Sequence, residues 1–306
     1  MIMLPVAPEN PPIRDRRQAF AAAPCAKIPG MRRPILFALW AVVAIIAART
    51  PAAADDVEIR SGELTLHAVL FKPEGAGPFP AVVALHGCSG LMRRPGQLGT
   101  RYRDWAERLV AAGFAVLFPD SFTARGIASQ CTVRERRVRS SRERVRDAEA
   151  ARRWLQAQSW VKPDRVSLMG WSSGATAALW TVRPRTATRD GGPDFRSAVA
   201  FYPGCRRLNE LAWSARVPTL VLIGEADDWT PATACQNMVR GAHGRSAFAE
   251  IIVYPGALHE FDHPDRPIAQ RTGLAFSADG SGRAHVATDK KARADALKRV
   301  PEWLSR

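Results

Sequence analysis

Short, continuous runs of apolar residues alternate along the chain with amphipathic segments. The runs lack polar alternation, which is typical of strands that are buried on both faces of a sheet. Between them, apolar residues recur at helical spacing. This order predicts an α/β fold with a mostly parallel central sheet and helices on both faces. The predicted strands are residues 81–85, 115–118, 166–169, 198–201, 219–223 and 251–254, and the predicted helices are 102–112, 139–156, 173–182, 231–240 and 289–304.

Two segments depart from this alternation. Residues 55–71 alternate between polar and apolar positions, which predicts an antiparallel hairpin at one edge of the sheet. Residues 271–291 are rich in Gly and Asp and predict a surface loop before the last helix. No long insertion suggests a large lid domain, and no internal repeat is visible. We therefore expect residues 55–306 to form one domain.

The first 54 residues carry the features of a processed leader. Two arginines follow Met31, 14 uncharged residues occupy positions 35–48, and three alanines end at Ala54. These are the three parts of a secretory signal peptide, residues 31–54, with cleavage after Ala54. The apolar run is short for a bilayer, so we expect no stable membrane insertion after cleavage; an uncleaved anchor is the alternative. Residues 1–30 are interpreted as a non-native or disordered extension.

The chain is strongly basic, with 44 Lys and Arg against 29 Asp and Glu and a formal net charge of +15. Of this charge, +5 lies in the leader and +10 in residues 55–306. Arginines concentrate in residues 134–153, where acidic residues lie between them and apolar residues share one helical face. The pattern favours a solvated helix face with salt bridges over a surface that binds nucleic acid or another polyanion.

Four cysteines lie outside the leader. An even number of cysteines in an exported protein indicates disulfides, for which three pairings are possible. Each of the four follows a predicted strand, so all four can lie at one end of the sheet. We expect the pairs Cys88–Cys131 and Cys205–Cys235, and a periplasmic or secreted location.

A Gly-x-Ser-x-Gly motif at residues 170–174 lies between a predicted strand and an Ala-rich predicted helix. A strand that turns into a helix within one residue strains the residue at the apex and leaves no room for side chains on either side, which explains the two glycines. The motif predicts that Ser172 is a nucleophile. Because a free hydroxyl is a poor nucleophile at neutral pH, Ser172 needs a base.

The candidate base and its orienting acid lie in two later loops. His259 follows the strand that is predicted last, at the end of the sheet where catalytic groups gather, and His263 is the competing candidate. Asp227 follows the preceding strand and is assigned as the acid that holds the imidazole in its reactive tautomer. Asp228 is the alternative acid.

An oxyanion hole needs two backbone N–H groups that point at the developing negative charge. The N–H of Ser173 is one candidate, because it follows the nucleophile in the turn. The N–H of Cys88 is the other, because Cys88 lies in the loop after the first long parallel strand. His86, in the same loop, is interpreted as a residue that shapes the loop.

Residues 259–263 match the H-E-x-x-H signature of zinc proteases. That chemistry requires a helix that places both histidines on one face. A Pro-Gly pair precedes the motif and Pro264 follows it, which disfavours a helix there. We therefore expect no metal site, and no other cofactor.

The ordered set of motifs resembles the dienelactone hydrolase family of the α/β-hydrolase superfamily. The resemblance implies an α/β-hydrolase fold without a large lid and the triad Ser172, Asp227 and His259. The founding enzymes of this family have a cysteine at the position of Ser172 and hold a substrate carboxylate with two arginines. Arg125 lies near the first of these two positions, and His263 stands at the second. The matching segments are residues 85–90, 118–122, 125–126, 170–174, 224–231 and 254–259.

These observations predict a serine hydrolase that cleaves small-molecule carboxylic esters or lactones through an acyl-enzyme on Ser172. Arg125, Trp171 and Trp229 are the candidate residues of the substrate pocket. A serine peptidase or amidase with the same triad and a non-catalytic ligand-binding relative are the alternatives, since a fold does not determine a function.

Overall fold

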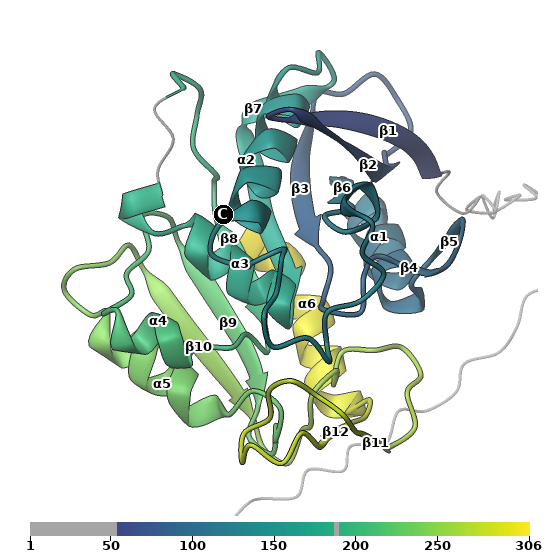
Figure 1. The fold of residues 1–306 in the computed structure, drawn as a ribbon. Coiled ribbons are helices and arrows are strands. Elements are labelled where there is room, and N and C mark those ends of the chain that lie inside the picture. Colours follow the sequence, from purple (N-terminus) through teal and green to yellow (C-terminus); the bar gives the residue numbers. More distant parts are fainter. Residues whose placement is uncertain (1–53, 187–189) are drawn as a thin grey trace, which may run out of the picture. The chain divides into compact units, whose positions relative to one another are not determined.

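The computed structural model describes residues 54–186 and 190–306. An eight-stranded sheet with the order β1-β2-β6-β3-β7-β8-β9-β10 forms its centre (Figure 1). The last six strands in this order are parallel to one another, whereas β1 and β2 are antiparallel. This confirms the predicted mostly parallel sheet and its edge hairpin. The strands are β1 (Ala54–Ser61), β2 (Leu64–Phe71), β3 (Phe79–Leu85), β6 (Ala115–Pro119), β7 (Val161–Trp171), β8 (Ala198–Phe201), β9 (Thr219–Gly224) and β10 (Ala249–Tyr254).

Helices cover both faces of the sheet. In Figure 1, α2 and α3 lie in front of the sheet and α6 lies behind it. Helix α1 packs beside α6, because Arg293 of α6 donates a hydrogen bond to Asp104 of α1 at 2.7 Å. The helices are α1 (Thr100–Ala111), α2 (Glu143–Gln156), α3 (Ser173–Thr181), α4 (Arg206–Glu210), α5 (Ala232–Gly241) and α6 (Lys290–Ser305), with short 3-10 turns at Thr123–Arg125 and Pro184–Thr186.

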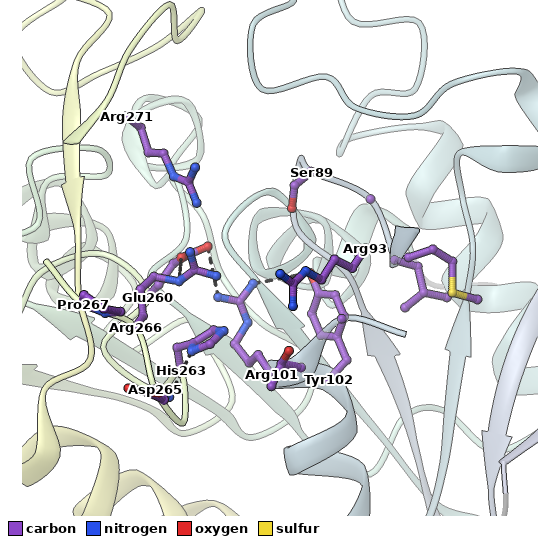
Figure 2. A pocket seen from close by; sticks show the side chains of 15 residues that line it. Ser89, Arg93, Arg101, Tyr102, Glu260, His263, Asp265, Arg266, Pro267 and Arg271 are labelled. Carbon is purple, nitrogen blue, oxygen red and sulfur yellow. Dashed lines mark hydrogen bonds and ion pairs between the residues drawn. The ribbon is translucent and has the colours of Figure 1, made fainter. Parts of the chain in front are cut away.

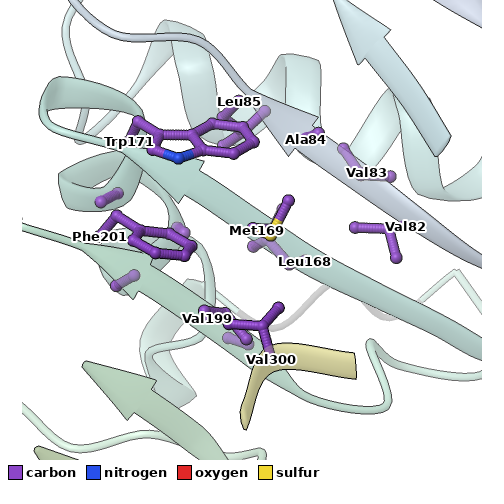
Figure 3. Close-up of a cluster of buried hydrophobic side chains, with 14 of the residues drawn as sticks. Val82, Val83, Ala84, Leu85, Leu168, Met169, Trp171, Val199, Phe201 and Val300 are labelled. Atoms are coloured by element: carbon purple, nitrogen blue, oxygen red, sulfur yellow. The ribbon is translucent and has the colours of Figure 1, made fainter. Parts of the chain in front are cut away.

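An aromatic stack forms the part of the core next to Ser172. The ring of Trp171 stacks on those of Phe118 and Phe201, with centroid distances of 6.3 and 5.8 Å. Figure 3 shows Trp171 and Phe201 on neighbouring strands, above Met169 and Val199. Trp171 is 0% exposed. It packs in the core because successive side chains of a strand point to opposite faces, so Trp171 and Ser172 diverge.

The segment predicted as a surface loop, residues 271–291, contains a strand. Strand β12 (Ala284–Val286) pairs antiparallel with β11 (Ala269–Arg271). Val286 also forms a β-bridge with His259, and the N–H of Ala287 donates to the carbonyl oxygen of His259 at 3.1 Å. The prediction of a surface loop over this whole segment was therefore wrong at residues 284–286. The Gly and Asp residues of this segment indicate an exposed turn, but they give no sign of the strand that contacts His259.

Both expected disulfides are present, between Cys88 and Cys131 and between Cys205 and Cys235. Within the described ranges, none of the helices combines the length and the apolar character that crossing a membrane requires. The predicted extension at residues 1–30 and all of the predicted signal peptide except Ala54 lie outside the described residues.

Candidate active site

Ser172 lies at the turn between β7 and α3 with φ 53° and ψ −118°. A residue with a side chain rarely adopts this backbone conformation, and about 1–3 kcal/mol of strain is typical there. The flanking glycines make the turn possible. A Cβ atom at Gly170 would lie 2.5 Å from the backbone of Gly174, and one at Gly174 would collide with the carbonyl oxygen of Leu85.

The turn places Ser172 next to a histidine and an aspartate from two other loops. His259 Nε2 lies 3.1 Å from Ser172 Oγ, and His259 Nδ1 lies 2.8 Å from Asp227 Oδ2. The histidine and aspartate side chains are buried. With its hydrogen on Nδ1, a neutral His259 donates to the carboxylate and accepts from the hydroxyl. This geometry can take the proton from a serine hydroxyl as it attacks.

The carboxylate of Asp227 is fixed by its own loop. Oδ1 accepts the N–H groups of Trp229 and Thr230 at 2.9 and 2.8 Å, and Oδ2 accepts the Thr230 hydroxyl at 3.0 Å. Asp228 instead contacts His285, with 2.7 Å between Oδ2 and Nδ1. Of the two candidate acids, Asp227 is therefore the one that contacts His259.

The loop after β3 passes beside the serine. A Cβ atom at Gly87 would lie 3.7 Å from Ser172 Cβ, so the backbone that leads to Cys88 adjoins Ser172. The N–H of Gly87 donates to Tyr102 Oη at 2.8 Å. The carbonyl of Cys88 accepts the N–H of Gln130 at 2.8 Å. The two candidate oxyanion donors, Cys88 and Ser173, thus lie in segments that flank Ser172.

A buried arginine connects these two segments. Arg144 Nη1 donates to the carbonyl oxygen of His86 at 2.7 Å and lies 3.5 Å from Ser173 Oγ. Burial lowers the pKa of Arg144 to about 10. His86 accepts the N–H of Ser121 at its Nε2, and burial together with Arg144 lowers its pKa to about 3. The neutral His86 therefore joins two loops, as expected for a residue that shapes the loop.

Asp262 is a buried residue that the sequence analysis did not single out. Its carboxylate accepts three side-chain hydrogen bonds, from the indole N–H groups of Trp105 and Trp171 at 2.8 Å each and from the Tyr202 hydroxyl at 2.6 Å. The Tyr202 ring lies against the His259 ring, with 4.4 Å between centroids. Asp262 therefore links the core to the histidine. An aspartate three residues after a histidine gives no signal of this in sequence.

The three candidate pocket residues lie in different surroundings. The Trp229 ring packs against His259 at 4.7 Å between centroids, beside the candidate site. Trp171 lies in the core. Arg125 forms a two-pronged ion pair with the buried Asp147, at 2.8 Å for both contacts, and also donates to the carbonyl of Ser121. A guanidinium engaged in this way has a structural partner already.

The H-E-x-x-H segment is a turn and not a helix. His259 faces the serine, while His263 Nδ1 accepts the N–H of Asp265 at 3.2 Å. Burial and nearby arginines lower the pKa of His263 to about 4. Across the described residues, no group of three or more His, Cys, Asp or Glu side chains is arranged to hold a metal ion.

Comparison with known proteins agrees with this architecture. The model of the dienelactone hydrolase family matches residues 66–306. The chain belongs to the dienelactone hydrolase family. It is therefore a hydrolase with the α/β-hydrolase fold.

Individual members of the family are distant in sequence. A Bradyrhizobium protein named as a probable 2-oxo-3-(5-oxofuran-2-ylidene)propanoate lactonase is 26% identical over 244 residues, which cover 72% of this chain and 90% of the relative. The dienelactone hydrolase of Anabaena variabilis is similar in fold, with a TM-score of 0.58 and 19% identity over 84% of this chain and 98% of that one. Esterase 2 of Thermogutta terrifontis also has a TM-score of 0.58, with 17% identity over 84% of this chain and 96% of its own.

Proposed function

We propose that this dienelactone hydrolase family member is a serine hydrolase that cleaves carboxylic esters or lactones through an acyl-enzyme on Ser172. One observation carries the proposal: Ser172, His259 and Asp227 form a continuous hydrogen-bonded relay at 3.1 and 2.8 Å. The serine has the strained conformation that exposes a nucleophile at a turn. Relatives named as lactonase and esterase support the substrate class.

In the first half-reaction, Ser172 Oγ attacks the carbonyl carbon while its proton moves to His259 Nε2. The carbonyl oxygen becomes an oxyanion, for which the N–H groups of Cys88 and Ser173 are the proposed donors. The bond to the leaving oxygen then breaks, and the departing alcohol takes the proton from His259. An acyl group remains on Ser172; with a lactone, the alcohol is part of the same acyl chain.

In the second half-reaction, water replaces the alcohol. His259 takes a proton from the water as its oxygen attacks the acyl carbon, and returns this proton to Ser172 Oγ when the acyl-oxygen bond breaks. Asp227 holds the imidazole in the required tautomer and stabilises its protonated form. The enzyme is regenerated and a carboxylic acid is released.

We also propose that the protein is exported by the signal peptide at residues 31–54 and acts in the periplasm or outside the cell. The two disulfides support this location, because such bonds persist in oxidising compartments. Mass spectrometry of the protein secreted from its host tests the proposal. An N-terminus at Asp55 is expected, and an intact leader in the purified protein would contradict it.

A p-nitrophenyl ester series from acetate to decanoate, with Ser172→Ala alongside, tests the proposed activity. Turnover that is lost in the variant, together with a phosphonate adduct on Ser172 of the wild type, is the expected result. Absence of both turnover and adduct would contradict the proposal and favour a ligand-binding role. Parallel peptide and anilide substrates separate an esterase from an amidase.

A further inference from the structure

A cavity of about 670 Å³ lies beside the candidate active site. It lies between the segment from Ser89 to Tyr102 and the loop that follows His259. Figure 2 shows four arginine side chains directed toward it from both sides. They are Arg93, Arg101, Arg266 and Arg271.

The charges around this cavity do not balance. Four arginines line it, against the two acids Glu260 and Asp265. His263, which also lines it, is neutral at pH 7 because burial and nearby arginines lower its pKa to about 4. The lining therefore carries a surplus of two positive charges.

The buried arginine of the cavity has an unused donor. Arg101 is only 7% exposed, and its Nε has no hydrogen-bond partner. Its Nη1 forms an ion pair with Glu260 at 3.3 Å, and Glu260 is shared with Arg266 at 2.7 Å. One carboxylate thus serves two guanidiniums. Buried donors without a partner are rare in proteins, and one that lines a cavity is available to a ligand.

The same position lies at the start of α1, a helix of 12 residues. Gly99 and Thr100 line the cavity, Gly99 is the N-cap, no side chain caps the helix, and its first turn contains no acidic residue. Free N–H groups at a helix N-terminus favour an anion. The N-terminus of the helix and the arginines therefore both favour a negatively charged ligand.

The cavity is also close enough to the serine to hold part of a substrate. Ser89 directly follows the proposed oxyanion donor Cys88, and Glu260 directly follows His259. Tyr102, whose Oη accepts the N–H of Gly87 at 2.8 Å, is another residue of the cavity lining. Glu260 has a φ of 65°, a conformation that a residue with a side chain rarely adopts, and its carboxylate contacts Arg101 and Arg266.

We propose that this cavity binds a dianionic phosphate group of the ester that Ser172 cleaves. A tetrahedral dianion matches both the surplus of two charges and the several directions from which the guanidiniums converge. Arginine is suited to this role because its planar fork makes paired hydrogen bonds to phosphate. The assignment rests on the proposed esterase function, which it narrows to substrates that bear a phosphate.

Binding is tested first, without turnover, by titrating inorganic phosphate into the Ser172→Ala protein at constant ionic strength. Calorimetry should show phosphate binding at least about tenfold tighter than acetate, the difference expected for one additional charge-assisted contact. The double variant Arg93→Gln/Arg271→Gln should lose this preference. These two arginines are exposed, so the variant preserves the buried pairs of Arg101. Arg94→Gln, an exposed neighbour outside the cavity, is the matched control and should change phosphate binding by less than about twofold.

Catalysis is tested with two esters that differ only in a phosphate, acetylglycerol 3-phosphate and monoacetin. The wild type should hydrolyse the phosphorylated ester with a kcat/KM at least about tenfold higher, and the ratio should fall toward one in the double variant but not in Arg94→Gln. Equal kcat/KM values in the wild type overturn the assignment to the substrate, even if free phosphate binds. Phosphate binding no tighter than acetate overturns the anion site while leaving the esterase proposal intact. Phosphate binding without hydrolysis of any ester contradicts the esterase proposal and, with it, the assignment to the substrate.

Discussion

Replacing the carboxylate of Asp227 by an amide tests the relay most directly. In Asp227→Asn, the amide oxygen can still accept the N–H groups of Trp229 and Thr230, so the loop should keep its conformation. The substitution instead alters the contact between Asp227 Oδ2 and His259 Nδ1, which are 2.8 Å apart and belong to two buried side chains. An amide there carries no charge, and its NH₂ group can face the imidazole and favour the wrong tautomer.

The size of the effect follows from this burial. Two unit charges about 4 Å apart interact by about 4 kcal/mol at an effective dielectric constant of 20, which corresponds to about 10³ in rate. Loss of the correct tautomer adds to this, and the equivalent change in serine proteases costs about 10⁴ in kcat. We therefore expect Asp227→Asn to lower kcat by about 10³–10⁴, with KM and the melting temperature nearly unchanged.

Asp228→Asn is the matched control for this substitution. Asp228 and its partner His285 are 40% and 41% exposed, and their contact does not reach Ser172. An exposed ion pair of this kind contributes little, so kcat should change by less than about threefold. The assay is steady-state hydrolysis of a p-nitrophenyl ester at pH 8, with circular dichroism to verify folding. A larger loss in Asp228→Asn than in Asp227→Asn would refute the assignment of the acid.

Four further outcomes follow from the structure. Ser172→Ala should lower kcat by about 10³–10⁶ with unchanged folding, as measured by ester hydrolysis and thermal unfolding; substantial residual turnover would identify another nucleophile. Asp262→Ala leaves three buried donors without a partner, at about 1–3 kcal/mol each, so thermal denaturation should occur at a clearly lower temperature than in the wild type. Replacing both Cys205 and Cys235 by Ser opens a loop of 30 residues and should reduce the free energy of unfolding, measured in urea, by about 3–4 kcal/mol. An almost unchanged free energy of unfolding would contradict this and indicate that the unfolded chain is already compact without the disulfide. Burial alone would raise the pKa of Glu260, but Arg101 and Arg266 lower it to about 2. The ionised Glu260 therefore stabilises the fold at any pH above the ordinary glutamate pKa, and this contribution is lost as the pH falls from about 5 to 2. Glu260→Gln should flatten that part of the acid-denaturation curve.

The fold and the grouping of Ser172 with an aspartate and a histidine could be predicted because each depends on a local sequence pattern. Strands buried on both faces appear as unbroken apolar runs, and the turn at Ser172 needs glycines at two fixed positions. Loops that follow parallel strands meet at one edge of the sheet, so an aspartate and a histidine in such loops can be brought together without knowledge of the coordinates. Which of two adjacent aspartates faces the histidine is decided by the turn at Asp227, whose backbone hydrogen bonds only the structure reveals.

The groups that the sequence does not reveal are those whose role depends on a distant partner. Arg125 stands near a position where the family has a substrate-binding arginine, but its guanidinium is engaged by Asp147, 22 residues later and buried. Arg101 and Arg266 are separated by more than 160 positions, and only the fold brings both to Glu260. No periodicity or spacing records such a contact.

Contacts between distant residues also allow the chain to tolerate an unfavourable arrangement at the edge of the sheet that holds Ser172. Strain at Ser172, a buried Arg144 whose pKa is lowered by desolvation, and an excess of arginines around Glu260 all oppose folding locally. The same edge is stabilised by the aromatic stack and by the two disulfides, and Cys88 itself belongs to the loop beside Ser172. Covalent and apolar contacts therefore offset the cost of the charged groups. The arginine-rich cavity at this edge is therefore kept in place by its neighbours as well as by the pairing of Arg101 and Arg266 with Glu260.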